Sequence, residues 1–379
     1  MGGTLAGFAH AADTASCPAA RQGASSPAAV SIDRGKLQKD IDALVKGGVT
    51  GIQVQVTDGS QQLALRGGVA ERGTSKPIAD QSHFRMGSNT KTFVATVMLQ
   101  LVGENKISLD DTVDSLLKDN TSRSGKNITV RQLLQHTSGL ADYEESLFSS
   151  MDTFNANRWK TYQPQDLVHM ALDNVPQPTP GTWSYSSANY ILAGMIIEKV
   201  TGNSWAQEVK ARITEPLGLS HTSSPGTATS LPQPHTQADL PTDEDGTWLD
   251  ITELNPSWAG AAGDMITTPD DLTRFWRALL QGQLLKPAQQ AEMQTTVDAV
   301  NDALPARSQA GLGLFKSPLS NGEWYWKHDG GIPGFETVNG FTPDGQRGIV
   351  ISLSGGHMDA AEKNKILDQM VDNALQNTC

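Results

Sequence analysis

The stretch "GIQVQVTDGSQQLALRGG", residues 51–68, alternates apolar and polar side chains on both sides of an Asp-Gly pair. Such alternation around an Asp-Gly turn is typical of a β-hairpin. A second stretch, "VNGFTPDGQRGIVISLSG" at residues 338–355, repeats the pattern. The two hairpins lie far apart in a chain of 379 residues, and we expect them to pair with each other in one antiparallel sheet.

Each hairpin adjoins a predicted helix. Residues 33–48 carry apolar side chains at helical spacing and end in two glycines, and residues 360–376 also have a helical pattern. Residues 88–290 are mostly helical in pattern, with loops rich in proline and glycine. We therefore predict an α/β (α+β) fold, in which an antiparallel sheet is flanked by the terminal helices and a large, mostly helical segment is inserted between its strands.

The amino terminus is predicted to direct export. The stretch "GGTLAGFAHAAD" contains an Ala-x-Ala site like that of a secretory signal peptide, although a basic segment is missing. We interpret residues 1–12 as a signal-peptide remnant and residues 13–32 as a flexible segment; an alanine-rich terminus without a targeting role is the alternative. The sheet region is expected at residues 33–87 and 291–379, the helical region at 88–290, and a catalytic cleft between the two.

Charge and composition argue against several classes of protein. The net charge is -12 with a pI near 5.1, and no cluster of Lys and Arg favours a nucleic acid or an anionic membrane surface as partner. No run of about 18 apolar residues predicts a transmembrane segment. Cys17 and Cys379 stand near the two chain ends, where an exported protein could join them as a disulfide. Their spacing gives no metal site.

The stretch "RMGSNTKTF", residues 85–93, places Ser88 three residues before Lys91, where an apolar helical pattern begins. At the first turn of a helix, residues i and i+3 share a face, so the Lys91 amine can reach the Ser88 hydroxyl. A lysine whose pKa is lowered by burial can take the serine proton and activate the nucleophile. The alternative is a serine that caps the helix. A second Ser-x-x-Lys pair, Ser115 and Lys118, fits a solvated surface.

Two further motifs favour Ser88 as the nucleophile. "TWSYSSANYILAGMIIEKVTG" places Tyr185 and Ser187 just before another apolar helix, and "WKHDGGIPGF" places His328 at the start of a predicted strand. Taken singly, Tyr185 fits a core aromatic residue and His328 a structural histidine. The order and spacing of the motifs support the catalytic interpretation instead. His136, in "QHTSGL", is expected to have a structural role in a loop.

In this order the three motifs resemble those of the penicillin-recognising serine hydrolases, and in particular the branch that contains class C β-lactamases and secreted actinomycete D-alanyl-D-alanine carboxypeptidases. The similarity covers nearly the whole chain from about residue 33 and includes "VRQLLQHTSGLADY", "PSWAGAAGDMITTPDDL" and "AGLGL". The resemblance implies a β-lactamase/transpeptidase-like fold with a catalytic cleft between the sheet and the helical region.

The resemblance also implies a role for each motif residue. Ser88 would be acylated, while Lys91 and Tyr185 would move protons between Ser88 and the leaving group. His328 would support this network, and the backbone N–H groups of Ser88 and Gly331 would form the oxyanion hole. The substrate-binding residues of the cleft would be Ser187, Trp258, Phe315, Asp329 and Gly330.

Three positions depart from the family pattern. Ser187 stands where asparagine is usual, so the side chain is shorter and lacks the amide. Phe315 and Gly331 stand where the resembling carboxypeptidases carry an arginine and a hydroxyl residue that hold the substrate carboxylate. Arginine binds a carboxylate through two parallel hydrogen bonds, and phenylalanine cannot. Lys316 is next to Phe315, but on a strand it would point to the opposite face.

We therefore expect a secreted serine hydrolase that forms an acyl-enzyme on Ser88, of D-alanyl-D-alanine carboxypeptidase type. Alternatives with the same chemistry are an esterase, a D-amino-acid amidase or aminopeptidase, and a class C-like β-lactamase. A penicillin-binding module without turnover is a weaker alternative. In each case the partner is a small peptide, ester or β-lactam substrate, and neither a metal nor another cofactor is implied.

Overall fold

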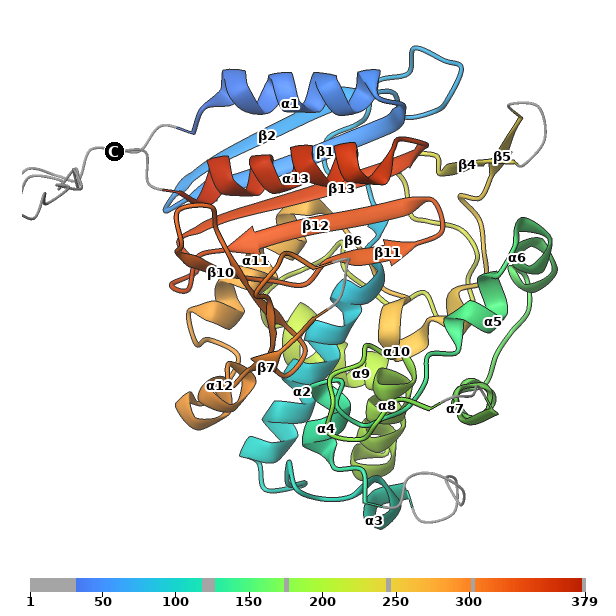
Figure 1. Cartoon of the computed structure of the whole chain (residues 1–379), viewed down its shortest axis with the longest axis vertical. Coiled ribbons are helices and arrows are strands. Elements are labelled where there is room, and N and C mark those ends of the chain that lie inside the picture. Colours follow the sequence, from blue (N-terminus) through green and yellow to red (C-terminus); the bar gives the residue numbers. More distant parts are fainter. Residues whose placement is uncertain (1–31, 118–126, 174–176, 243–246, 301–303, 377–379) are drawn as a thin grey trace, which may run out of the picture. The chain divides into compact units, whose positions relative to one another are not determined.

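The computed structural model describes residues 32–117, 127–173, 177–242, 247–300 and 304–376 (Figure 1). The predicted signal-peptide remnant, the flexible segment up to residue 31 and the pair Cys17 and Cys379 lie outside the described residues. In the described part of the chain, no helix is long and apolar enough to cross a membrane.

One antiparallel sheet joins the two ends of the sequence, as the alternating patterns predict. Strand β1 pairs with β2 on one side and with β13 on the other, so that Val54 lies opposite Ile351. Strand β13 also pairs with β12, and the short edge strand β11 pairs with β12 as well. In sheet order the strands are β2 (Gln61–Gly68), β1 (Val49–Asp58), β13 (Arg347–Gly356), β12 (Phe335–Phe341), β10 (Trp324–Lys327), β9 (Phe315–Pro318), β8 (Gln309–Ala310) and β7 (Val297–Asp298), with β11 at Gly330–Ile332.

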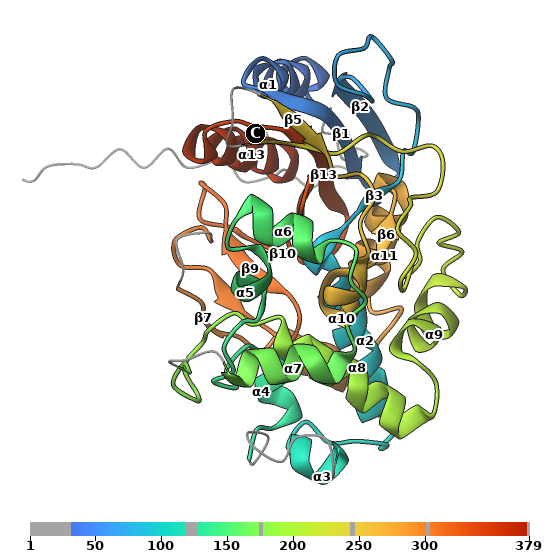
Figure 2. The same ribbon diagram turned by 90° about the vertical axis from the view of Figure 1, so that its right-hand side faces the viewer.

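The terminal helices α1 (Arg34–Lys46) and α13 (Ala360–Leu375) lie side by side on one face of the sheet (Figures 1 and 2). Both begin at an aspartate whose side chain accepts a hydrogen bond from a first-turn backbone N–H, which satisfies a group that the helix leaves free. Their apolar faces and the facing side chains of the sheet form one continuous core. The sheet with flanking terminal helices is therefore confirmed.

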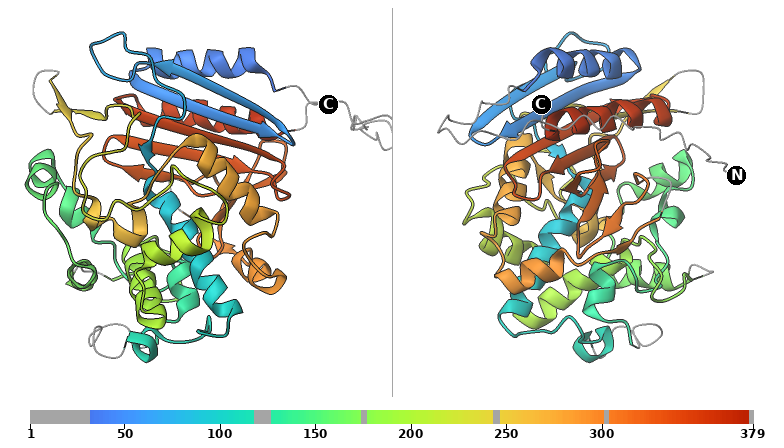
Figure 3. Two further views of the ribbon diagram at one scale, coloured as in Figure 1. Left: turned by 180° about the vertical axis from the view of Figure 1, so that it is seen from behind. Right: turned by 60° about the vertical axis from the view of Figure 1, so that its left-hand side comes forward.

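The opposite face of the sheet is covered by the inserted helices. Figure 3 shows α11 (Pro269–Leu280) beneath the strands, where the Trp276 ring stacks on Phe341 of β12 at 5.6 Å. The other helices are α2 (Thr90–Gly103), α3 (Val113–Leu117), α4 (Val130–Leu134), α5 (Glu144–Phe148), α6 (Met151–Asn157), α7 (Pro164–Asp173), α8 (Ala188–Thr201), α9 (Trp205–Val209), α10 (Gly260–Gly263) and α12 (Pro287–Met293). Two small strand pairs, β3 (Phe84–Arg85) with β6 (Ile266–Thr267) and β4 (Asp239–Pro241) with β5 (Trp248–Asp250), complete this region.

Helix α2 is buried on all sides rather than on one face. Every residue from Thr90 to Leu99 is buried, because the helix packs against α8, α10 and α12, and Phe93 stacks on Phe275 of α11 at 3.5 Å. A helix that is surrounded in this way has no solvated side for a charged residue. Lys91, in its first turn, therefore holds its amine in the protein interior.

We expect the buried Trp276 ring, which stacks on Phe341, to contribute strongly to the free energy of unfolding. Trp276→Ala should lower the free energy of unfolding by about 3–5 kcal/mol, because it removes a fully buried ring between α11 and the sheet. Trp159→Ala removes a ring that is 51% exposed and should cost about 1 kcal/mol or less. Urea unfolding followed by circular dichroism measures both, and equal losses would contradict this account of the core.

Candidate active site

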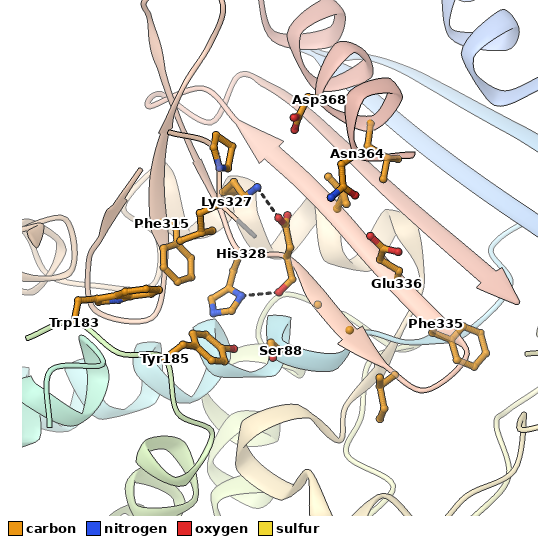
Figure 4. Close-up of a pocket in the computed structure, with 18 residues that line it drawn as sticks. Ser88, Trp183, Tyr185, Phe315, Lys327, His328, Phe335, Glu336, Asn364 and Asp368 are labelled. Carbon is orange, nitrogen blue, oxygen red and sulfur yellow. Dashed lines mark hydrogen bonds and ion pairs between the residues drawn. The ribbon is translucent and has the colours of Figure 1, made fainter. Parts of the chain in front are cut away.

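The backbone turn at Gly87 presents Ser88 at the start of α2. A short 3-10 helix, Gly87–Asn89, precedes α2, and Gly87 has a φ of 53°, which a residue with a side chain rarely adopts. The Ser88 side chain faces a cavity of about 590 Å³ that also reaches Tyr185 and His328 (Figure 4). The structure thus brings the three sequence motifs to one cavity.

The Lys91 amine lies directly behind Ser88 and has no exposed surface. Its Nζ donates to Ser88 Oγ at 3.0 Å, to Ser187 Oγ at 3.2 Å and to the carbonyl oxygen of Ala262 at 2.8 Å. Burial lowers the pKa of Lys91 to about 8, against the opposing effect of Glu144 and Asp142. A substantial fraction of this lysine is therefore neutral at mildly alkaline pH and can accept the serine proton.

Tyr185 supplies a second proton-carrying group beside the serine. Burial raises the pKa of its hydroxyl well above the usual value and outweighs the opposing effect of Ser88, so the phenol keeps its proton. Its ring stacks on His136 at 4.2 Å, and His136 Nδ1 accepts a hydrogen bond from the Ser186 backbone. The contact between His136 and Tyr185 gives the expected structural role of His136 a physical basis, since it fixes the tyrosine ring.

Ser187 lies beneath the cavity instead of in its wall. It is fully buried, and its hydroxyl accepts from Lys91 Nζ and donates to Glu144 Oε1 at 2.6 Å. It is not among the residues that line the cavity, and its hydroxyl links Lys91 to Glu144; a contact with substrate stays a prediction. A single hydroxyl oxygen makes both hydrogen bonds of this link, whereas an asparagine would use the separate oxygen and nitrogen of its amide.

Glu144 is the acidic residue that the sequence interpretation did not identify. Burial raises its pKa, and the neighbouring Asp142 acts in the same direction. Asp142 itself accepts a hydrogen bond from the Ser187 backbone at the start of α8. No spacing relative to Ser88 marks Glu144 in the sequence, because its position depends on how the first residue of α5 packs against Ser187, just before α8.

His328 is held neutral in the wall of the cavity. It lies after β10 and before β11, not at the start of a strand as predicted. Its Nδ1 is 2.7 Å from the carbonyl oxygen of Asp329 and therefore carries the proton. Burial, and then the nearby Lys91, lower the pKa of His328 to about 3. Its Nε2 is buried without a hydrogen-bond partner among the described residues, and so it can accept a hydrogen bond from a substrate.

Gly330 brings β11 into direct contact with the turn before Ser88. A Cβ at Gly330 would overlap the carbonyl oxygen of Met86, and one at Gly87 would lie 2.9 Å from the Gly331 nitrogen. The Asn339 amide on β12 donates to Asn89 Oδ1 at 2.6 Å and to the His328 carbonyl at 2.8 Å, which ties the two segments together. The predicted oxyanion hole requires such proximity of the backbone at Ser88 and Gly331.

The cavity has an aromatic end and a charged end (Figure 4). Phe315 contacts both Trp183, at 6.2 Å between ring centroids, and His328, at 5.1 Å. Lys316 lies with its amine over Trp324, away from Phe315, as the alternation along a strand predicts. The charged end of the cavity contains Lys327, Asp329, Glu336 and Asp368.

Trp258 is not placed in the cavity wall. It ends a short 3-10 helix, Pro256–Trp258, and its ring packs edge-on against Phe148 at 4.4 Å. Only 4% of its surface is exposed, and its carbonyl accepts a hydrogen bond from Tyr143. In this structure the ring turns toward α5 and the hydrophobic core, and a contact with substrate stays a prediction.

No group of three or more His, Cys, Asp or Glu side chains suited to a metal ion occurs in the described ranges.

Comparison with known proteins agrees with this geometry. The family model described as Beta-lactamase matches residues 37–370, so the chain belongs to the β-lactamase family. The structure resembles that of a D-stereospecific amidohydrolase from Streptomyces sp., with a TM-score of 0.81, 38% identity, and coverage of 89% of this chain and 98% of that one. It also resembles the D-amino acid amidase of Ochrobactrum anthropi SV3, with a TM-score of 0.79, 28% identity, and coverage of 89% and 97%.

Among curated relatives, penicillin-binding protein 4 of Amycolatopsis lactamdurans is 27% identical over 329 residues, which cover 83% of this chain and 80% of the relative. The resemblance stated from the sequence motifs is confirmed, and so is the β-lactamase/transpeptidase-like fold. The chain is a serine hydrolase of this family.

The buried Lys91 predicts a pH dependence. Because the neutral amine is the base, kcat/KM should rise with pH through about 8 and then level off. Glu144→Gln removes a carboxylate that favours the charged amine, so the pKa of Lys91 should fall and the rise should move to lower pH. The hydrogen bond from Ser187 can persist, since glutamine also has an accepting oxygen.

The pH profile of kcat/KM for an ester substrate measures this shift. Glu71→Gln changes a carboxylate that is 47% exposed and pairs with Lys76; it is the matched control and should leave the profile in place. A rise that stays at the same pH in Glu144→Gln would exclude electrostatic control of Lys91 by Glu144.

From the close contact at Gly330 we expect that a side chain at this position lowers activity. Gly330→Ala should lower kcat by about 10²–10³-fold, because the added methyl group pushes β11 and the Gly331 N–H away from Ser88. Gly331→Ala adds a methyl group that meets no atom within 4 Å and should cost far less. Steady-state kinetics compare the two variants, and similar kcat values would argue against an oxyanion hole at this contact.

Proposed function

We propose that this protein hydrolyses amides of D-amino acids through an acyl-enzyme on Ser88. The observation that carries the proposal is the charge of the cavity. Among its described lining residues, Lys327 is the one cation, and it is held in an ion pair by Asp329. A free substrate carboxylate would find no unpaired positive charge there, whereas a neutral amide needs none.

The proposed reaction uses the three polar groups at the serine. Neutral Lys91 takes the Ser88 proton as Oγ attacks the carbonyl carbon, and the backbone N–H groups of Ser88 and Gly331 stabilise the oxyanion. Protonated Tyr185 donates to the leaving nitrogen as the C–N bond breaks, and the Lys91 proton then restores the phenol. Neutral Lys91 then takes a proton from a water molecule as its oxygen attacks the acyl carbon, and this proton passes to Ser88 Oγ as the ester bond breaks and the amino acid leaves.

The aromatic end of the cavity supports an apolar group on the substrate. Phe315 and Trp183 form an apolar wall next to His328. Phe315 stands at the position where the resembling carboxypeptidases carry an arginine that binds the substrate carboxylate. Their faces favour an aromatic or aliphatic group of the amide. The similarity to a D-stereospecific amidohydrolase and to a D-amino acid amidase, each over nearly the whole length of both chains, supports the same substrate class.

Hydrolysis of D-alanyl-D-alanine peptides is the second candidate, since penicillin-binding protein 4 of Amycolatopsis lactamdurans is similar over most of its length. Esterase and β-lactamase activity use the same acyl-enzyme and remain further alternatives. Export, suggested by residues 1–12 alone, belongs to the same proposal; sequencing the amino terminus of protein recovered from the culture medium tests it.

A substrate panel tests the proposed function. D-phenylalanine amide should be hydrolysed with a kcat/KM at least about tenfold above that for its L enantiomer or for a D-Ala-D-Ala peptide, a difference of about 1.4 kcal/mol in transition-state stabilisation. A short-chain ester and a cephalosporin complete the panel, and Ser88→Ala should abolish turnover of every substrate. Preferential release of D-alanine from the peptide would establish the carboxypeptidase instead.

A further inference from the structure

The Lys91 amine has two hydroxyl partners, and they compete for one lone pair. As an ammonium group it donates to Ser88 Oγ, to Ser187 Oγ and to the carbonyl oxygen of Ala262. The neutral amine that acts as the base has only two N–H groups and one lone pair. A carbonyl oxygen can only accept, so one N–H must remain on Ala262. The lone pair therefore points either at Ser88 or at Ser187.

Only one of these two orientations allows the reaction. With the lone pair toward Ser88, the amine can take the serine proton as Oγ attacks a carbonyl carbon. With the lone pair toward Ser187, the amine would accept the hydroxyl hydrogen of a residue that does not line the cavity, and Ser88 would lose its base. The direction of the Ser187 hydroxyl hydrogen therefore decides whether neutral Lys91 is active.

A carboxylate directs the Ser187 hydroxyl away from Lys91. Ser187 Oγ donates to Glu144 Oε1 at 2.6 Å, a short hydrogen bond of the kind that a hydroxyl makes with a charged acceptor. An ionised carboxylate can only accept, so the hydrogen of this bond must come from Ser187. The Ser187 oxygen then presents a lone pair to Lys91 Nζ at 3.2 Å. Lys91 keeps an N–H on Ser187, and its own lone pair points to Ser88.

The Ser187 hydroxyl is enclosed by protein and held at both sides. Ser187 has no exposed surface, so solvent does not reach its hydroxyl. Its backbone N–H donates to Asp142 Oδ2 at 3.0 Å, which anchors the residue directly before α8. Glu144 is the first residue of α5, so its carboxylate is anchored by a second helix. The heavy atoms are therefore fixed, and the direction of the hydroxyl hydrogen depends on which neighbour accepts it.

We propose that Glu144 is a positioning residue that makes the Ser187 hydroxyl an acceptor and thereby points the Lys91 lone pair at Ser88. The asparagine that is usual in place of Ser187 in the resembling hydrolases has an amide oxygen, which can only accept. A serine hydroxyl can accept or donate, so it needs the carboxylate to fix its direction. The inference rests on the acyl-enzyme of the proposed function, with Lys91 as the base, and not on the choice of an amide as substrate.

Two substitutions separate the direction of this hydrogen bond from the charge of Glu144. Glu144→Gln removes the charge and keeps an accepting oxygen, whereas Glu144→Leu removes both at similar size. Both should move the rise of kcat/KM to lower pH, because both remove a charge that favours the ammonium form of Lys91. On the plateau above that rise, Glu144→Leu should lose about ten- to hundredfold, part of the roughly 10²–10⁴-fold that a general base contributes. Glu144→Gln should recover most of this loss.

A double-mutant cycle with Ser187→Ala shows whether the loss acts through the hydroxyl. Ser187→Ala removes the competing donor, so adding Glu144→Leu to it should change the plateau by less than about twofold. Glu71→Gln again serves as the surface control, and thermal unfolding verifies that each variant is folded. An equal loss from Glu144→Leu with and without the Ser187 hydroxyl, or equal plateaus in Glu144→Gln and Glu144→Leu, overturns the proposal.

Two substrates keep this test distinct from that of the proposed function. The plateaus are measured with D-phenylalanine amide and with p-nitrophenyl acetate, whose leaving group needs little help from a proton donor. Hydrolysis of the acetate alone contradicts the proposed amide substrate, and the variants are then compared on the acetate. Turnover of neither substrate contradicts the acyl-enzyme on Ser88 and with it both proposals.

Discussion

The structure is organised around an ammonium group that has no access to solvent. Removing a charged amine from water costs several kcal/mol even after the protein relaxes, so Lys91 needs a full set of acceptors. It finds them on three separate segments: Ser88 at the start of α2, Ser187 before α8 and the carbonyl of Ala262 in α10. Each segment is thereby held at a fixed distance from the others. The arrangement of α2, α8 and α10 and the activation of the serine depend on the same three hydrogen bonds.

Burial acts on the titratable groups of this site in opposite directions, and both directions are useful. It lowers the pKa of the basic groups Lys91 and His328, and it raises the pKa of the acidic groups Tyr185 and Glu144. A single physical cause therefore supplies a neutral base, a neutral acceptor and a protonated phenol. Glu144 opposes the lowering of the Lys91 pKa by burial, since a negative charge beside the amine favours the ammonium form. The balance between desolvation and this carboxylate determines the pH range in which the serine can be activated.

Features with a fixed local period could be predicted from the sequence, and features that depend on long-range packing could not. The alternation at residues 51–68 and 338–355 defined the sheet, and the i, i+3 spacing of Ser88 and Lys91 defined their contact. The packing of Trp258 against Phe148 could not be predicted, because a 3-10 turn, unlike a strand or a long helix, gives no rule for the side on which a ring lies. Glu144 was missed because only tertiary packing brings it under Ser187. The match between His328, Tyr185 and Ser88 succeeded through resemblance, since no local period links them.

The close approach of β11 and the turn at Gly87 has a consequence for how the family can change over time. At this contact a methyl group has no space, so the permitted residue is decided by a neighbouring backbone and not by the substrate. A substitution at Phe315, in contrast, changes the wall of the cavity while the two backbones stay together. Because the restriction at Gly330 comes from backbone packing, the loss of hydrolytic activity would not by itself release it.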